Sequence, residues 1–331
     1  MIYSKVYYEP DILNYDLGKR LKDKFQHLEW IPIESHNNIE ELRNKENKEF
    51  VKMKSYLIIG TRKTHKYVEN QKSSDFLVPF TSSGCSAMCL YCYLVCNYNK
   101  CSYLRIYVNT DQIISKLIKK SYSTEELSTF EIGSNSDLVL ENELTGNLVR
   151  VIEEFGEKGR GFITFPTKFN MVDDLLNLHH NGKTIIRMSL NPQYIISKIE
   201  IGTSSLEERI IALNKVCDKG YKVGILIAPV VFVDNWEAIY IELLDILKEK
   251  LSDKVKKEMF IEIIFMTYSY IHNAINEQAF PNAIALYNKE LMTGRGRGKY
   301  IYKKEYRDHA ETLLREEIHK RFDCANIMYV V

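Results

Sequence analysis

Three cysteines stand close together in the first third of the chain. Cys85, Cys89 and Cys92 follow the spacing C-x3-C-x2-C, directly after a short apolar segment and beside Gly84. Thiolates bind iron–sulfur clusters, and a [4Fe–4S] cluster held entirely by protein requires four of them. Three ligands would leave one iron open for a substrate or cofactor, much as a catalytic zinc keeps one open position. The spacing therefore predicts a cluster of this open kind.

A zinc site is the alternative interpretation of the same loop. Zinc would need a fourth ligand, which Cys96, Cys101 or His65 could supply. Structural zinc sites usually combine two C-x2-C pairs, however, and the sequence contains no second pair. Five of the seven cysteines lie between residues 85 and 101, and such clustering in a cytosolic chain favours metal binding over disulfides.

Length and composition limit the kinds of protein that this chain can be. The 331 residues are 45% hydrophobic, which is enough for one large packed core. The 45 basic and 44 acidic residues nearly cancel, so any nucleic-acid surface must be a local patch. No apolar run reaches the roughly 18 residues of a membrane span, and the N-terminus lacks a signal-peptide pattern. We therefore expect a cytoplasmic protein without membrane contact.

Short apolar segments alternate with helical patterns over most of the chain, which is typical of βα units that build a parallel sheet. The expected strands are residues 55–60, 76–80, 104–109, 129–133, 162–165, 184–190, 222–231, 260–265 and 326–331. The expected helices are residues 17–28, 39–54, 140–155, 171–180, 205–219, 236–249 and 308–321, with another that begins near residue 112. So many units suit a barrel or partial barrel, whose active site lies at the C-terminal ends of the strands.

The cysteine loop resembles the signature of radical S-adenosylmethionine enzymes. Its surroundings, from Pro79 to Asn109, resemble the spore photoproduct lyase family. Further matching segments are YEP (8–10), GTRK (60–63), PTKF (166–169), HNGK (180–183), SLN (189–191), GTS (202–204) and GKYIY (298–302). The likeness thus covers nearly the whole chain in order, which a single cysteine motif would not.

The resemblance implies a fold and a division of the chain. The fold would be α/β, a partial (β/α) barrel of the radical S-adenosylmethionine type. Residues 1–75 would form an N-terminal α/β extension, and residues 76–290 the partial barrel. Residues 291–331 would form a basic hairpin, a helix and a strand that contact DNA.

The resemblance also implies a chemistry. A reduced [4Fe–4S] cluster would cleave S-adenosylmethionine to a 5′-deoxyadenosyl radical, which abstracts a hydrogen atom from C6 of the spore photoproduct, 5-thyminyl-5,6-dihydrothymine. The thymines separate, a hydrogen atom is returned, and S-adenosylmethionine is regenerated. The implied partners are UV-damaged double-stranded DNA, from which the lesion is flipped, and a reductant such as flavodoxin or ferredoxin. The implied location is the cytoplasm of the spore core or germinating cell.

Cofactor contacts follow from matching positions. The three cysteines of the loop would be the cluster ligands. Ser136, Lys168 and Ser189 match family positions that contact S-adenosylmethionine, since hydroxyls suit its ribose and a lysine can pair with its carboxylate. Two alternatives stay open, a helix N-cap for Ser136 and a solvated loop charge for Lys168.

Hydrogen transfer is the point at which the sequence departs from the family. Tyr91 and Tyr93 stand where the family has tyrosines able to relay a hydrogen atom, although one ring could simply pack. Ser134 stands where the family has its hydrogen-donating cysteine, and an alcohol gives up a hydrogen atom poorly. We therefore expect Cys96 or Cys101 to be the donor, with Cys96 preferred. Their alternative interpretation is as small buried residues.

The segment 294–304 (GRGRGKYIYKK) contains five cations and two tyrosines. Arginine forks onto phosphates, and tyrosine can stack on a base or wedge into a base step. On composition alone a solvated loop is as plausible as a nucleic-acid contact. The resemblance favours DNA binding by Arg295, Arg297, Lys299 and Tyr300.

Two further hypotheses for the function stay open. The replacement at Ser134 motivates a radical enzyme of the same fold that acts on another substrate. The zinc interpretation of the loop leads instead to a zinc-containing nucleic-acid-binding protein without enzyme activity.

Overall fold

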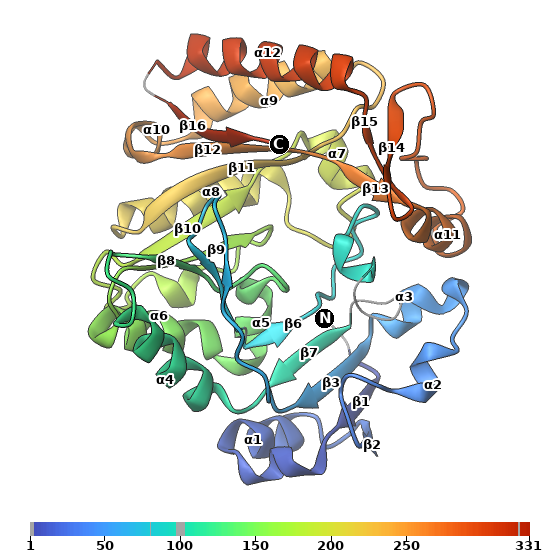
Figure 1. Cartoon of the computed structure of the whole chain (residues 1–331), viewed down its shortest axis with the longest axis vertical. Coiled ribbons are helices and arrows are strands. Elements are labelled where there is room, and N and C mark those ends of the chain that lie inside the picture. The colour runs from blue at the N-terminus through green and yellow to red at the C-terminus, as the bar shows by residue number, and fades with distance from the viewer. Residues whose placement is uncertain (1–2, 80, 97–102, 324) are drawn as a thin grey trace. The chain divides into compact units, whose positions relative to one another are not determined.

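The structure is a computed structural model of the chain (Figure 1). It describes residues 3–79, 81–96, 103–323 and 325–331. The chain falls into two compact units, of which the first comprises residues 1–88, 93–165 and 178–184, and the second residues 89–92, 166–177 and 185–331. In the part of the chain that the structure describes, no helix is long and apolar enough to cross a membrane.

A five-stranded sheet forms part of the first unit. Its strands are β1 (Lys5–Tyr8), β2 (Glu29–Pro32), β3 (Tyr56–Gly60), β6 (Ser82–Ser83) and β7 (Leu104–Tyr107), in the order β2-β1-β3-β7-β6. All neighbours are parallel except β6 and β7. The sequence YLIIG of β3 is buried along its whole length, as expected of a parallel strand covered on both faces. At the edge of this sheet, β6 leads directly into the cysteine loop.

The helices of the first unit differ from the prediction in their continuity. They are α1 (Asp16–Lys24), α2 (Glu40–Arg43), α3 (Phe50–Met53), α4 (Thr110–Ser121), α5 (Leu138–Thr145) and α6 (Asn147–Lys158), with the 3-10 helices η1 (Pro10–Asn14), η2 (Asn47–Glu49) and η3 (Tyr93–Cys96). The single helix expected over 39–54 is wrong, because α2, η2 and α3 divide that segment. The helix expected over 140–155 is interrupted at Gly146, whose left-handed φ of 70° ends α5.

An eight-stranded sheet has the order β16-β12-β11-β10-β9-β8-β5-β4. Its strands are β4 (Val68–Glu69), β5 (Phe76–Leu77), β8 (Thr129–Glu131), β9 (Phe162–Thr167), β10 (Thr184–Ser189), β11 (Lys222–Val230), β12 (Phe260–Phe265) and β16 (Asn326–Val330). Strands β5, β8 and β9 are parallel, as are β10, β11, β12 and β16, whereas β4 runs antiparallel to β5. Helices follow most of these strands along the chain, as predicted for βα units.

The second unit contains most of the remaining helices. They are α7 (Gln193–Lys198), α8 (Leu206–Asp218), α9 (Trp236–Lys250), α10 (Asp253–Glu258), α11 (Tyr270–Ala279) and α12 (Lys304–Arg321), with η4 (Asp173–Leu175). The helix expected over 171–180 is wrong, since only η4 forms there. Val172 and Leu175 are the buried residues of this segment. No buried residue follows them before residue 180, so a longer helix would have no continuous apolar stripe to pack.

The C-terminal segment contains the predicted hairpin, helix and strand. Strands β13 (Thr267–Ser269), β15 (Lys299–Tyr302) and β14 (Met292–Gly296) form a separate antiparallel sheet in that order. Helix α12 packs against α9 (Figure 1), and β16 pairs with β12. The division of the chain at residues 75 and 290 stays a prediction.

Candidate functional site

The start of the cysteine loop is fixed within the first unit by backbone contacts. Gly84, with a φ of 80°, forms an isolated parallel bridge with Ser136, and its N–H donates to the carbonyl of Asn135 at 2.7 Å. Lys54 Nζ donates to the carbonyl oxygen of Cys85 at 2.7 Å. The N–H of Ala87 donates a hydrogen bond to Cys85 Sγ at 3.3 Å. Cys85 is therefore held by its carbonyl and by a hydrogen bond to its sulfur, and the residue is partly exposed.

The end of the loop, residues 89–92, is fixed within the second unit. The N–H of Leu90 donates to Ile199 O at 3.0 Å, and its carbonyl accepts from Asn276 Nδ2 at 2.9 Å. His272 Nε2 donates to Cys92 O at 3.0 Å, which assigns the proton to this nitrogen because a carbonyl can only accept. Helix α11 thus anchors the backbone around two of the predicted ligands.

Three cysteines are the type of donor that an iron–sulfur cluster with one open iron requires. None of the three predicted ligands is in a disulfide, and all three are partly exposed. Among the described residues, which include these three cysteines, no group of three His, Cys, Asp or Glu side chains lies close enough together to hold a metal ion, so the type of donor and not the geometry supports the site. Of the other residues considered for zinc, His65 lies in the first unit, the side chain of Cys96 is not described, and Cys101 lies outside the described residues.

Ser136 and Ser134 lie in the connection between β8 and α5. Ser136 Oγ bonds to Ser82 Oγ at 2.8 Å, next to the bridge to Gly84. The N-cap of α5 is Asp137 and not Ser136, so the capping alternative for Ser136 is wrong. The hydroxyl of Tyr93 donates to the carbonyl of Ser134. The structure therefore brings one of the two flanking tyrosines to Ser134, the residue that the sequence analysis matched to the family's cysteine.

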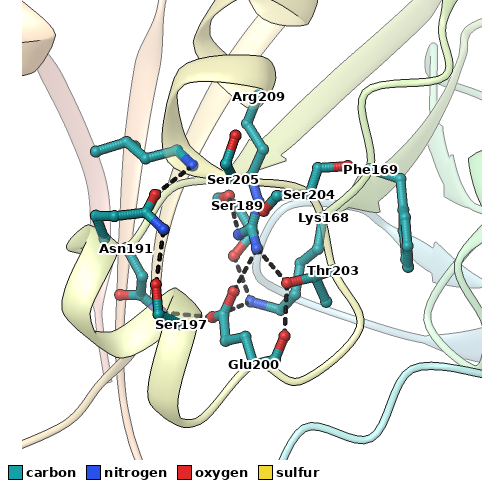
Figure 2. A network of polar contacts seen from close by, with 12 residues as sticks. Lys168, Phe169, Ser189, Asn191, Ser197, Glu200, Thr203, Ser204, Ser205 and Arg209 are labelled. Atoms are coloured by element: carbon teal, nitrogen blue, oxygen red, sulfur yellow. Dashed lines mark hydrogen bonds and ion pairs between the residues drawn. The ribbon is translucent and has the colours of Figure 1, made fainter.

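A buried network of charges follows the ends of β9 and β10 in the second unit. Figure 2 shows Lys168 and Arg209 pointing toward the carboxylate of Glu200. Lys168 Nζ lies 2.9 Å from Glu200 Oε1, and Arg209 Nη2 lies 2.6 Å from Oε2. Asn191 Nδ2 donates to the same carboxylate at 2.8 Å, and the hydroxyl of Tyr91 also donates to it. We call these five residues the Glu200 network.

Lys168 joins this network to Ser189, its partner in the prediction. Its ammonium also donates to Ser189 Oγ at 2.6 Å and to the carbonyl of Ala228 in β11 at 2.9 Å. With Glu200, these contacts give the ammonium three acceptors, which matches its three N–H groups. The interpretation of Lys168 as a solvated loop charge is therefore wrong, since only 21% of its side chain is exposed.

The electrostatics of the Glu200 network keep its carboxylate ionised. Burial alone would raise the pKa of Glu200, but the nearby charges of Lys168 and Arg209 lower it well below the usual range. Glu200 and Arg209 have fully buried side chains. Burial, followed by the charge of Glu200, raises the pKa of Tyr91 and keeps its hydroxyl protonated.

Sequence reasoning missed Glu200, Arg209 and His272. Glu200 stands between two isoleucines, which is a weak signal for a buried acid. Arg209 follows two glutamates in the first turns of α8 and reads as part of a solvated face. His272 is only 4% exposed and carries no motif. Glu200 pairs with Lys168, 32 residues away, and His272 binds Cys92, 180 residues away, whereas Arg209 lies nine residues from Glu200 but in a separate element.

The hairpin presents the predicted DNA-binding residues. Arg297 and Gly298 occupy its turn with φ of 52° and 68°, which is the left-handed backbone of a tight hairpin turn. Arg295, Arg297 and Lys299 are exposed, and we call them the hairpin cations. Within the described residues, none of them is in an ion pair. Tyr300 is half-buried, and its ring centroid lies 4.7 Å from that of Tyr287.

Comparisons with known proteins find relatives over the whole length of the chain. The family model described as spore photoproduct lyase matches residues 1–331. The chain is 36% identical over 334 residues to the spore photoproduct lyase of Bacillus subtilis (strain 168), covering 98% of this chain and 97% of the relative. It is 35% identical over 335 residues to that of Geobacillus sp. (strain Y412MC61), covering 98% and 97%.

Solved structures show the same likeness. A spore photoproduct lyase complexed with dinucleoside spore photoproduct superimposes with a TM-score of 0.91 at 32% identity. A mutant with bound AdoMet (S-adenosylmethionine) and dinucleoside spore photoproduct gives 0.92 at 32% identity, and both comparisons cover 100% of this chain and 99% of the other. The predicted α/β partial-barrel fold and the predicted lyase class are thereby confirmed. The chain belongs to the spore photoproduct lyase family.

Proposed function

We propose that this protein repairs the spore photoproduct in UV-damaged double-stranded DNA and returns it to two thymines. The observation that carries the proposal is the full-length likeness to relatives solved with the dinucleoside lesion bound. Of the three hypotheses drawn from the sequence, family membership selects the radical enzymes. The lesion forms in chromosomal DNA, so the work would take place in the cytoplasm of the spore core or germinating cell.

The cysteine loop would hold the cluster. Cys85, Cys89 and Cys92 would be its three ligands, supported by their thiols, none of which is in a disulfide. When bound, the cluster and S-adenosylmethionine supply a 5′-deoxyadenosyl radical that takes a hydrogen atom from C6 of the lesion. The chain itself holds the loop in place through Lys54 and His272, which bind the carbonyls of the first and last ligands. A reductant such as flavodoxin or ferredoxin would provide the electron.

Three polar residues would hold S-adenosylmethionine. Lys168 and Ser189 follow or end neighbouring strands on the C-terminal side, where such folds bind ligands. The carboxylate of the cofactor would replace one of the three acceptors around Lys168, since a charged acceptor binds an ammonium more strongly than a hydroxyl or carbonyl does. Ser136 would contribute from the segment that is bonded to Gly84.

The return of a hydrogen atom to the thymine radical would depend on Tyr93, the second of the two tyrosines that flank Cys92. Tyr91 is buried and its hydroxyl is bound to Glu200, which suits a residue that positions others. Tyr93 is 54% exposed and contacts Ser134. Cys96 ends the same 3-10 helix that Tyr93 begins, and would give its S–H hydrogen atom to the thymine radical. Tyr93 would restore that S–H bond with its own hydrogen atom, and would recover one from 5′-deoxyadenosine.

The hairpin would hold the DNA. The hairpin cations would contact phosphates, supported by their exposure and by the absence of ion pairs around them in the described part of the chain. Tyr300 would contact a base. Because the lesion must reach a buried cofactor, the damaged dinucleotide would be flipped out of the stack.

Turnover of the synthetic dinucleoside lesion tests the proposal. Anaerobically reconstituted, reduced protein with S-adenosylmethionine should release thymine, whereas a Cys89→Ala control should lack both iron and turnover. Cofactor cleavage without thymine release would contradict repair and favour a radical enzyme with another substrate. A colourless parent protein with one zinc would contradict the radical class.

Product analysis of Cys96→Ala tests the donor. This variant should still break the bond between the thymines, because hydrogen abstraction does not involve the thiol. The unquenched thymine radical should then give side products, such as adducts with the reductant. A clean yield of thymine at the parent rate would rule out Cys96, and Cys101→Ala would be compared in the same assay.

A further inference from the structure

We propose that Tyr270 is a base-stacking residue for the damaged strand, which rests on the proposed function. Tyr270 begins α11 directly after β13, and 60% of its side chain is exposed. Its N–H donates to the carbonyl of Gly298 at 3.2 Å, so it lies at the turn of the hairpin. No motif marked this residue, because it lies 24 residues before the basic segment, which begins at Gly294.

The ring of Tyr270 packs against the backbone of Gly298. A Cβ atom added at Gly298 would lie 2.2 Å from Tyr270 Cδ1 and 2.3 Å from Cε1. Only glycine therefore allows the ring to lie this close to the turn, and the positive φ of 68° favours glycine for a second reason. The ring thus rests against backbone on one side while most of its surface faces solvent.

The tyrosines of the neighbouring sheet are packed against protein, among them Tyr268, which is 2% exposed and stacks on His272. Tyr300 is half-buried and packs against Tyr287. Tyr302 is 2% exposed and stacks on Phe232, with ring centroids 4.1 Å apart. Tyr270 is consequently the ring near the hairpin with the most surface available to a ligand.

The charge around the ring identifies the ligand as a nucleobase. Gly298, which seats the ring, lies between Arg297 and Lys299, both exposed and without an ion pair in the described part of the chain. A planar aromatic ring beside unpaired cations matches a base attached to a phosphate backbone. Stacking uses the π-face that every base has, so Tyr270 would hold a base next to the flipped lesion without reading its sequence.

Affinity for a lesion-containing duplex oligonucleotide, measured by fluorescence anisotropy on the cluster-loaded protein, tests the inference. Tyr270→Ala should weaken binding by roughly five- to a hundredfold, the range of one base–aromatic stack. Tyr270→Phe should bind within about twofold of the parent because the ring is retained. The salt dependence should be unchanged in both, since no phosphate contact is lost. Tyr122→Ala is the matched control, because this tyrosine is 62% exposed and belongs to the other unit.

The outcomes separate this inference from the proposed function. Parent-like affinity of Tyr270→Ala, in a protein whose Arg295→Ala/Arg297→Ala variant binds weakly, would overturn the stacking role and leave the hairpin surface intact. Failure of the parent to bind any DNA would overturn both. If Tyr270→Ala does not fold, Tyr270→Leu keeps apolar bulk without a π-face, and parent-like affinity of that variant would likewise overturn the inference.

Discussion

The hairpin and the Glu200 network both contain cations, but they use them in opposite ways. The hairpin cations are exposed, and no carboxylate of the described residues pairs with them. In the network, Lys168 and Arg209 share the buried carboxylate of Glu200 at 2.9 and 2.6 Å. A buried charge must be paired because its desolvation is costly. An exposed charge is solvated by water, so it can lack a protein partner and remain available to a ligand. In the proposed function, the network would position other residues and the hairpin would bind a polyanion.

Removal of the Glu200 carboxylate should have the largest effect on stability. Glu200→Ala leaves Lys168 and Arg209 buried without their common anion, and this should lower the free energy of unfolding by about 3–5 kcal/mol. Urea unfolding would measure the loss. The matched control is Glu207→Ala on the same helix as Arg209, since its pair with Lys250 is exposed and should contribute about 1 kcal/mol or less. Equal losses in the two variants would remove the distinction between buried and exposed pairs.

A second buried glutamate sharpens the comparison because no cation of the described residues forms an ion pair with it. Glu141 in α5 is fully buried and accepts hydrogen bonds from Thr145, Asn147 and Thr81. Burial raises its pKa to about 7, and these hydrogen bonds offset only part of the rise. Glu200 and Glu141 thus show that the partners, and not burial alone, decide whether a buried carboxyl is charged.

The raised pKa of Glu141 predicts a pH dependence. From about pH 4.5 to 7 the unfolded chain loses this proton while the folded chain keeps it, so stability should fall by up to about 3 kcal/mol as pH rises. Glu141→Gln cannot ionise and should lack this decline. Its stability relative to the parent should therefore increase from pH 4.5 to 7 and then level off. Parallel pH profiles for parent and variant would contradict the shift.

Substitutions in the hairpin should change DNA binding and not stability, in contrast to substitutions at either buried glutamate. Arg295→Ala/Arg297→Ala should weaken DNA binding and lower the slope of log affinity against log salt by about two, one for each phosphate contact. Anisotropy titrations across a salt series would measure the slope, and thermal unfolding should be nearly unchanged. A variant that keeps the slope of the parent would place the DNA surface elsewhere.

The smallest effect is expected from cations that are already paired on the surface. Lys304 at the start of α12 lies 2.6 Å from Asp308 and follows the hairpin in the sequence. Lys304→Ala should change DNA affinity by less than twofold, because the ion pair already satisfies its charge. A loss as large as that of Arg295→Ala would show that proximity to the hairpin, and not the lack of a partner, decides which cations bind.

The two regions also differ in how far they could be predicted from the sequence. The hairpin is local, since GRGRGK places glycine where the turn needs a left-handed backbone and puts the cations within five residues. The cysteine loop is equally local. The Glu200 network depends on the depth at which α8 buries Arg209, and Tyr270 depends on its contact with Gly298. Such long-range packing leaves no pattern in a single sequence.

The affinities for S-adenosylmethionine and for DNA, both measured on the cluster-loaded protein, test most directly whether the network and the hairpin have separate roles. Lys168→Met should weaken S-adenosylmethionine binding at least about tenfold, the effect of one lost charge-assisted hydrogen bond, and leave DNA affinity unchanged. Arg295→Ala/Arg297→Ala should weaken DNA binding and leave the affinity for S-adenosylmethionine unchanged. If either variant loses both affinities together, or if Lys168→Met binds the cofactor as the parent does, the separation of the buried network from the hairpin is contradicted.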